Sequence, residues 1–392
     1  MSQYILINRI KVQNANAIAG FTWGFPAITH FLGFSHNLSR KLIAANDFNN
    51  ASLIGCAVIA HEHHVHTYRS SADYEFIQSR NPAFQHKEKP EYKVGTPPVI
   101  EEGKMNLTVS LLIEYEGNIG GNQVEGFTQW LMKNCLLQRL AGGTILNIKS
   151  IDLYNSDGNG LRTIKRKLLP GFILRDRSDY LKENDKAELL DTWLDFSTLK
   201  QKARPKSNLI SQKLKKQAKN NSETETLAFN GLIESWQKHL ETPYQEDSIP
   251  DELKQYFNKL EKNKANEKLL SQWKDYCQPN EKTDADWEYI AKPKTGYLVP
   301  IMTGYKAISE VYPNHEVGST RDNETDVCFV ESVHSIGEWQ SVHRLKNEEQ
   351  LKDCLWHYHY EKDWYLCKQN QTKQGVTSNN ESNTENPDDE LS

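Results

Sequence analysis

The first 155 residues carry two hydrophobic periods in a set order, and that order restricts the fold more than any other feature of the chain. The sequence YILINRIKV, residues 4–12, alternates between two sets of side chains, which is typical of a strand with one covered face. After it, Pro26 suits the first turn of a helix, and apolar residues recur at helical spacing from Ile28 to Leu42. These patterns predict a first strand and a first helix, joined by a polar loop.

The later segments continue this order. Two strand patterns, a helical pattern and a final strand pattern follow along the chain, at residues 52–68, 105–117, 124–143 and 144–154. We expect the pair Gly142–Gly143 to cap the second helix, with Arg139 at its end. Strand, helix, strand, strand, helix, strand is the ferredoxin-like order, and RNA-recognition modules of this arrangement bind RNA on the open sheet face. The predicted fold class is therefore α+β, with a ferredoxin-like (RRM-like) βαββαβ core.

The rest of the chain divides by composition. Residues 68–102 are polar and contain prolines, which predicts a long inserted loop or hairpin between the two central strands. Residues 179–276 carry amphipathic helical patterns, but the basic sequence at 199–221 has few apolar residues, so we expect it to be exposed and partly flexible. Strand patterns then return, and residues 348–360 predict a last helix. The acidic sequence after Lys373 is expected to be disordered.

Charge and cysteine content restrict the class of protein. The formal net charge of −5 does not favour a generic nucleic-acid binder, yet only bases occur between Phe196 and Ser222 and only acids after Lys373. No apolar run approaches the roughly 20 residues that span a bilayer, and Arg9 and Lys11 lie too early for a signal peptide. The 6 cysteines are scattered without a C-x-x-C motif, so we expect reduced thiols in a cytoplasmic protein that does not contact membranes.

Two histidine-containing sequences raise the question of a metal site. In AHEHHVH, His61 and His63 would share one face of a strand, with the other histidines mostly opposite. Zinc needs about four convergent ligands, so a polar strand end whose histidines can stack on bases is the favoured interpretation. In CLWHYHYEKDWYLC, Cys354 and His357 would lie at i, i+3 on the expected helix, but packing explains its aromatic rings without zinc. We therefore expect neither a metal nor another cofactor.

The chain carries no nucleotide or hydrolase motif. The patterns G-x-x-x-x-G-K-[ST], G-x-S-x-G and H-E-x-x-H do not occur. Metal-independent RNA cleavage would need a positioned general base and acid, for which His30, His36 and the histidines of residues 61–66 are candidates. The sequence leaves this alternative open.

Basic clusters and the first loop point to RNA contacts. Seven basic residues are grouped in the first half, and they are Arg139, Arg162, Lys165, Arg166, Lys167, Arg175 and Arg177. Such groups neutralise phosphates, although a solvated surface explains any single one equally well. In the loop, Gln13, Asn14 and Asn16 can bond to base edges or ribose. Trp23 or Phe25 can stack on a base or hold the start of the helix.

Seven segments carry a resemblance to a known family. They occur in the order of that family, and they are RIKVQNANAIAGFTWGFPAITHFLGFSHNLSRKL, EEGKMNLTVSLLI, RLAGGTIL, RKLLPGF, GYLVPIMTGYKAIS, RDNETDVCFVES and GEWQSVHRL. Together they resemble the Csy-two, or Cas-five-type, subunit family of the type I-F CRISPR surveillance (Csy/Cascade) complex. The basic sequence around 200–270, the acidic tail and the histidine-rich strand depart from the pattern of that family.

The resemblance implies a role in antiviral defence without catalysis. A protein of this family belongs to the repeat-associated RNA-binding superfamily, has a ferredoxin-like palm and an added thumb-like or helical region, and caps the 5′ handle of the guide CRISPR RNA. Its expected partners are that RNA, the large subunit, the backbone subunits and, through the complex, target double-stranded DNA. A metal-independent endoribonuclease that processes CRISPR repeat RNA is the alternative, because some members of the superfamily cleave RNA.

The sequence patterns and the resemblance together predict four regions of the chain and a set of RNA-binding residues. The expected regions are an RNA-binding palm, a helical subdomain, C-terminal strands with a helix, and a disordered tail, at residues 1–175, 176–290, 291–370 and 371–392. The residues assigned to RNA binding are Gln13, Asn14, Asn16, Trp23, His36, Arg40, Arg139, Gly142, Gly143, Arg162, Arg166 and Lys167.

Overall fold

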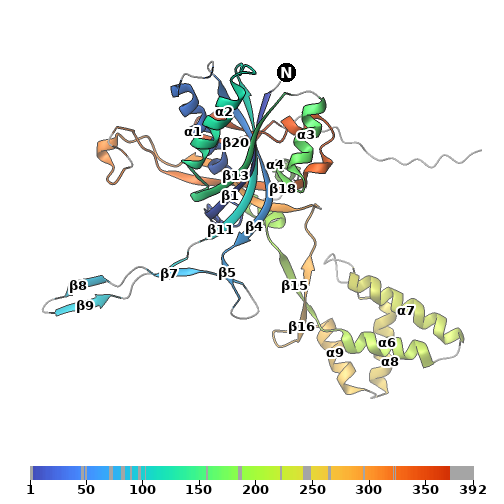
Figure 1. Cartoon of the computed structure of the whole chain (residues 1–392). Coiled ribbons are helices and arrows are strands. Elements are labelled where there is room, and N and C mark those ends of the chain that lie inside the picture. The colour runs from blue at the N-terminus through green and yellow to red at the C-terminus, as the bar shows by residue number, and fades with distance from the viewer. Residues whose placement is uncertain are drawn as a thin grey trace, which may run out of the picture. The chain divides into compact units, whose positions relative to one another are not determined.

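The chain forms two compact units. The computed structural model describes residues 3–45, 48, 51–69, 74–80, 84–88, 91–95, 99–101, 103–155, 158–183, 188–220, 223–241, 249–263, 266–294, 296–320, 322 and 324–370. Met1–Ser197 and Thr295–Ser392 form one unit, which we call the sheet unit, and Thr198–Lys294 form the other, which we call the helical unit (Figure 1). The expected acidic tail, residues 371–392, lies outside the described residues.

The sheet unit is built on one antiparallel sheet of 10 described strands. Its order is β12, β13, β1, β11, β4, β14, β18, β17, β20, β19. The bounds in that order are Arg139–Leu140, Gly143–Asn155, Gln3–Asn16, Lys104–Glu116, Ser52–Val65, Phe172–Asp176, Val330–Ser341, Leu298–Ala307, Trp364–Gln369 and Trp356–Glu361. The long strands β1, β4, β11 and β13 lie where the sequence predicts strands, and they are neighbours in the sheet. The protein is therefore a mixed α and β fold with a large antiparallel sheet.

Two helices cover the first face of this sheet. The helices α1 (Ile28–Ala45) and α2 (Val124–Leu136) form where the sequence predicts them and lie on the same side of β1, β11 and β13 (Figure 1). Ile5 and Ile7 of β1 are fully buried in one cluster with side chains from both helices. The apolar stripe of each helix thus meets the apolar set of each strand, as their periods require.

In the described part of the chain, the second face is covered at one end only. The helix α3 (Gly158–Leu168), the 3₁₀ helix η2 (Val342–Arg344) and α10 (Glu348–Lys352) supply apolar side chains to this face. Tyr4, Leu6 and Leu112 lie beneath them and are at most 1% exposed. Further along the same strands, this face turns polar, and Lys11 and Gln13 are exposed.

Irregular pairing marks the change between the two halves of this face. The register between β1 and β11 shifts between Ile7 and Ile10, and Arg9 there has a φ of 50°. The register between β11 and β4 shifts between Thr108 and Val109. Such bulges increase local twist and redirect side chains, so they separate the covered half from the open half.

The remaining elements of the sheet unit are short. The first loop and the insertion between β4 and β11 contain β2, β3, β5, β6, β7, β8, β9 and β10, at Ile18–Ala19, Thr22–Trp23, Thr67–Tyr68, Glu75–Phe76, Gln78–Arg80, Phe84–Glu88, Glu91–Gly95 and Val99–Glu101. In the insertion, β5 pairs with β6, β7 with β10 and β8 with β9, all antiparallel. The 3₁₀ helix η1 (Asn314–Glu316) lies between β17 and β18.

The helical unit joins a two-stranded sheet to four described helices. The strands are β15 (Lys200–Pro205) and β16 (Ala285–Ile290), and the helices are α6 (Asn208–Asn220), α7 (Glu223–Glu241), α8 (Asp251–Lys262) and α9 (Glu267–Cys277). The expectation that the basic sequence buries nothing is wrong. Ile210 and Leu214 are at most 1% exposed and pack with Trp236. Two apolar residues four apart suffice for a covered helix face.

Three further boundaries differ from expectation. The helical unit begins at Thr198 and not at residue 176, since α4 (Ser178–Glu183) and α5 (Leu189–Ser197) pack on β18 and β17. The pair Gly142–Gly143 does not cap α2, which ends at Leu136; it forms the turn between β12 and β13. The expected last helix ends at Lys352, after which β19 and β20 form a hairpin. Its alternating aromatic residues have the period of a strand.

Candidate nucleic-acid interface

The open half of the second face forms a groove of about 400 Å³. Polar side chains from three strands line it, and they are Lys11, Gln13, Glu62, His64, Asn106 and Thr108. The sequence positions them by alternation. Met105, Leu107 and Val109 fill the first face, which leaves Asn106 and Thr108 on the second. We call this site the polar groove.

Few contacts tie down the side chains of the polar groove. The Asn106 Oδ1 accepts a hydrogen bond of 3.0 Å from the backbone N–H of Asn14, and the Thr108 hydroxyl donates to the Glu62 carboxylate over 3.4 Å. Lys11, Gln13 and His64 are exposed. An ammonium group, an amide and an imidazole on one strand surface are groups that bind phosphate, ribose and base edges.

A hydrogen-bond network around His61 closes the groove toward the covered half. The His61 Nδ1 lies 2.7 Å from the Pro170 carbonyl oxygen, so this nitrogen carries the proton and donates. Its Nε2 therefore accepts from the Ser110 hydroxyl, whose Oγ lies 2.7 Å away and itself accepts from the backbone N–H of Arg9 over 2.8 Å. Burial lowers the pKa of His61, and the bond to Pro170 partly opposes this effect. Both ring nitrogens are thus occupied by structural contacts.

The turn between β12 and β13 docks on the end of β1. The Asn16 amide donates to the Ala141 carbonyl oxygen over 2.8 Å. A Cβ atom on Gly143 would lie 2.6 Å from the Gln13 carbonyl oxygen, so only glycine allows this approach. Gly142 has a φ of 76° and open space around its Cα. The turn therefore brings Arg139, Gly142 and Gly143 together with the Gln13–Asn16 segment.

The three polar residues that the sequence predicts in the first loop lie at the end of β1 and have different surroundings. Asn16 folds back on its own chain, since its Oδ1 accepts from the Ile18 amide over 3.1 Å and its Nδ2 donates to the Ile18 carbonyl oxygen. Asn14 has a φ of 55° and an exposed side chain. Gln13 is exposed at the polar groove. Of the three, Gln13 and Asn14 present their amides to solvent.

The aromatic residues of the loop pack within the protein. The Trp23 ring lies 3.7 Å from the Phe76 ring, measured between centroids, and lies against Gly103. Phe25 stacks on Phe31 of α1 with centroids 5.3 Å apart. Phe25 thus holds the start of α1, whereas Trp23 holds the insertion to the loop.

The basic residues of α3 lie at the far end of the sheet from the β12–β13 turn. Lys165 donates to the Leu345 carbonyl oxygen, and Lys167 pairs with Asp152 over 2.8 Å. Arg162 and Arg166 are exposed. Because Asp152 is nine residues along β13 from Gly143, about 30 Å of strand separates the two groups.

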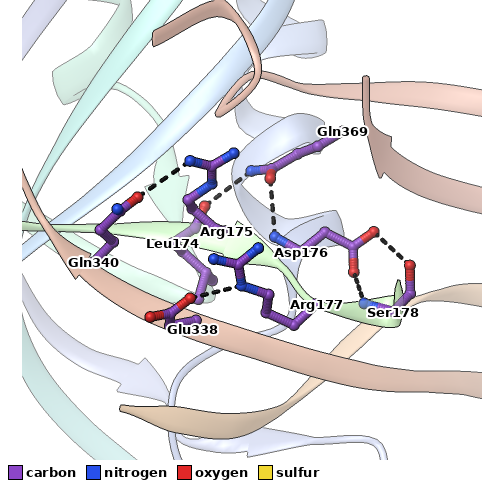
Figure 2. Close-up of polar contacts among 8 residues, drawn as sticks. All are labelled: Leu174, Arg175, Asp176, Arg177, Ser178, Glu338, Gln340 and Gln369. Carbon is purple, nitrogen blue, oxygen red and sulfur yellow. Dashed lines mark hydrogen bonds and ion pairs between the residues drawn. The ribbon is translucent and has the colours of Figure 1, made fainter. Parts of the chain in front are cut away.

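Arg175 and Arg177 are structural residues. Arg175 is 8% exposed and donates to Gln340 over 3.2 Å, and Arg177 pairs with Glu338 over 2.6 Å. Figure 2 shows both guanidinium groups beside the adjacent strand, and Gln369 bonding to the backbone of β14. The sequence interpretation of these two arginines as phosphate ligands is wrong, because their side chains join β14 to β18.

The two remaining predicted residues lie on α1, which covers the first face. His36 and Arg40 are exposed, and the His36 ring lies 5.7 Å from Tyr358 in an edge arrangement. Asn37 on the same helix donates to Gln138 over 2.6 Å, one residue before Arg139. The structure does not bring His36 and Arg40 to the polar groove.

The histidine-rich strand is divided between two surfaces. His64 lines the polar groove, whereas His61 and His63 line a separate aromatic cavity, with His63 also reaching the groove. Among the described residues, no group of three or more His, Cys, Asp or Glu side chains converges in a way that could hold a metal ion. No helix in the described part of the chain has the length and apolar character to cross a membrane.

Four of the groove residues, Lys11, His64, Asn106 and Thr108, are not among the residues that the sequence singled out for RNA binding. Asn106 and Thr108 share strand parity with the second-face residues of β11 and were available from alternation, whereas Lys11 and His64 reach this face because the bulges at Arg9 and His61 change the parity of β1 and β4. Alternation also does not show which half of the second face is covered by other elements. The half of the face that stays open depends on α3, η2 and α10, which come from distant parts of the chain.

Comparison with known proteins gives one consistent result. The family model described as CRISPR-associated protein (Cas_Csy2) matches residues 5–228 and 234–367. The CRISPR-associated protein Csy2 of Pseudomonas aeruginosa (strain UCBPP-PA14) is 28% identical over 375 residues, which cover 92% of this chain and 92% of that protein.

Proposed function

The chain belongs to the CRISPR-associated Csy2 family, and from this premise we propose that it binds the 5′ handle of the guide RNA in a type I-F complex without cleaving it. The observation that carries the proposal is the polar groove beside the Gln13–Gly143 contact. There, exposed amide, imidazole and ammonium groups lie on an open sheet face. That combination suits single-stranded RNA, whose phosphates, riboses and base edges are all accessible.

The order β13, β1, β11, β4 supports a ferredoxin-like, RRM-like core as the scaffold of this site. In this scheme RNA follows the open half of the second face, because the covered half is filled with apolar side chains. Arg139 holds phosphate near the glycine turn. Arg162 and Arg166, about 30 Å away along β13, contact a different part of the RNA or a partner.

A non-catalytic role is favoured by two of the candidate histidines, His61 and His30. General acid–base cleavage needs a ring nitrogen within hydrogen-bond reach of the 2′-hydroxyl or the leaving oxygen. Both nitrogens of His61 are bonded to protein groups, and the His30 Nδ1 is buried. The expected partners are the large subunit, the backbone subunits and, through the complex, target double-stranded DNA, in a cytoplasmic ribonucleoprotein for antiviral defence.

Co-purification tests the proposal directly. The full chain is expressed with the large subunit and a CRISPR array transcript, and the RNA that travels with it is sequenced. We expect guide RNA with a defined 5′ end. The double variant Lys11→Glu and Arg139→Glu should retain less RNA and show a flatter salt dependence, whereas Lys368→Glu on β20, a single charge reversal outside the groove, should retain RNA like the wild type.

Two results would contradict the proposal. The first is equal retention of array RNA by the wild type and the double variant across the salt series. The second is a defined cut in a repeat RNA incubated with the purified chain in EDTA, abolished by His30→Gln or His61→Gln. That second outcome would favour the endoribonuclease alternative.

A further inference from the structure

An aromatic cavity lies beside the polar groove. Its volume is about 540 Å³, and it opens between the end of β4, the β2–β3 loop, β14 and the strands β17 and β18. Five rings line it, and they are Trp23, Phe25, Phe172, Tyr297 and Trp339. Apart from Trp23, which packs on Phe76, the residues assigned above to RNA binding do not line this cavity.

The rings form a fixed floor and an exposed rim. Phe25 lies between Phe31, at 5.3 Å, and Trp339, at 4.8 Å in an edge arrangement. At the rim, Phe172 is 42% exposed and Tyr297 is 71% exposed, and their centroids are 6.0 Å apart. Large exposed rings beside an apolar hollow are typical of binding surfaces, because exposure of such area to water is unfavourable.

The cavity lies on the first face of β4, where Val65 and Met105 line it, and the polar groove lies on the second face of the same strand. The strand β14 pairs with β4 only at Ala60 and Ile59, so the described sheet leaves the edge of β4 beyond Ala60 without a neighbour on that side. His63 lines both the groove and the cavity, and it is exposed. An RNA backbone that turns around this edge passes from the groove on the second face to the cavity on the first face.

The chemistry of the two sites together selects the occupant. A nucleobase has two apolar faces for stacking and a polar edge, and base–aromatic stacking is the general means by which proteins hold single-stranded RNA. The rings offer the stacking surface, and the His63 imidazole lies at the mouth, where a polar edge would remain. An apolar peptide would gain nothing from the adjoining ammonium, amide and imidazole groups of the groove.

We propose that the aromatic cavity receives one unstacked base of a single-stranded RNA whose backbone crosses the polar groove. This inference rests on the proposed function and deepens it. The histidine-rich strand then has a role, since its edge is the ridge over which the RNA turns. Phe172 and Tyr297 close on the base from the rim, and Trp339 and Phe25 form the floor.

The test measures binding of a fluorescently labelled single-stranded RNA with the sequence of the CRISPR repeat to the full chain. Replacing both rim rings, Phe172→Ala with Tyr297→Ala, should weaken binding about tenfold, because each stacking contact contributes appreciably to affinity. Tyr297→Phe keeps the ring and should bind like the wild type. Tyr360→Ala removes an aromatic residue that is 78% exposed on β19, away from the cavity, and is the matched control. Ultraviolet cross-linking of the wild-type complex should attach RNA to cavity peptides.

The outcomes separate the two proposals. If the wild type binds the RNA and the double rim variant binds it equally well, the cavity proposal is overturned and the proposed function stands. If the rim variant binds RNA normally but no longer co-purifies with the large subunit, the cavity is a protein-docking site and the proposal is overturned as well. A wild-type chain that does not bind the RNA would overturn both.

Discussion

The two halves of the second sheet face use the same strands in opposite ways. Near the N-terminal end of β1, Tyr4 and Leu6 are buried beneath α3 and the segment from η2 to α10. A few residues later, Lys11 and Gln13 of that strand are exposed in the polar groove. Strict alternation would put Lys11 and Gln13 on the opposite face from Tyr4 and Leu6, and the bulge at Arg9 brings the two pairs to the same face. The difference between the halves shows that the position of a site on a sheet depends on where the elements that cover the face end, which here are α3, η2 and α10.

The bulges and the His61 network lie at the border between the halves. A regular strand would keep one face uniform, whereas the shift at Arg9 changes which side chains follow Asn8 on the second face. The bonds from His61 to Pro170 and Ser110 then tie β4 and β11 to the end of α3. The border between the two halves therefore depends on specific contacts, and substitution of single residues can test it.

The largest expected effect comes from removing a side chain in the covered half, which tests whether the two halves differ in burial. Leu112→Ala deletes a fully buried side chain beneath α3 and should lower the free energy of unfolding by about 3 kcal/mol. Leu146→Ala in the open half, at 58% exposure, should change it by less than about 0.5 kcal/mol. Urea denaturation of the full chain measures both. Equal losses in the two variants would mean that the halves do not differ in burial.

The glycine turn at the open end gives the next effect. Gly143→Ala places a Cβ atom 2.6 Å from the Gln13 carbonyl oxygen and should destabilise the protein by about 2 kcal/mol through forced backbone movement. Gly142→Ala meets open space but must keep a φ of 76°, which costs about 1 kcal/mol. Thermal unfolding of both variants checks the order. A Gly142 variant that is less stable than the Gly143 variant would contradict the proposed close docking.

Lys11 tests the polarity of the open half. Lys11→Ala should reduce the slope of log affinity against log salt by about 0.7, the value for one phosphate contact on single-stranded RNA. The measurement is a salt titration of binding to a CRISPR-repeat RNA. Lys346→Ala, exposed in the loop next to the covered half, serves as control. An unchanged slope for Lys11→Ala would remove this residue from the phosphate contacts.

The smallest expected effect concerns pH at the border. Since burial lowers the folded-state pKa of His61, its stabilisation is complete above the unfolded value of about 6.5 and is lost as the pH falls toward the folded-state pKa. The free energy of unfolding of the wild type should therefore decrease from pH 7.5 to pH 5.5. His61→Gln should show a smaller decrease, with the exposed His63→Gln as control. Parallel pH profiles for all three proteins would show that His61 does not contribute.

Much of the fold was predictable, because its core elements carry strong periods. The sequence predicts β1, α1, β4, β11, α2 and β13, each of which supplies apolar side chains to the core between the two helices and the first face. The glycine turn between β12 and β13 and the last hairpin, β19–β20, were not predictable in the same way. A glycine pair after an apolar stripe fits both a helix cap and a strand turn, and only the docking of Gly143 on Gln13 decides between them.

The site was predictable by residue type and only partly by position. Gln13, Arg139, Gly142 and Gly143 converge as the proposed role requires, and the exposed Arg162 and Arg166 lie elsewhere on the sheet unit. Arg175 and Arg177 have the same side chain as Arg166 and the same local composition. Their burial against β18 is set by a strand more than 150 residues away, which no local pattern records.

The amino-acid sequence by itself determined the elements of the sheet, the family resemblance and the chemical character of each strand face, because these depend on local period and residue type. Tertiary structure alone decided which half of the second face stays open, which arginines bind other protein groups, and that Trp23 packs on Phe76 beside an aromatic cavity. The physical reason is that burial is a property of what packs on a side chain, and here the cover comes from residues far along the chain.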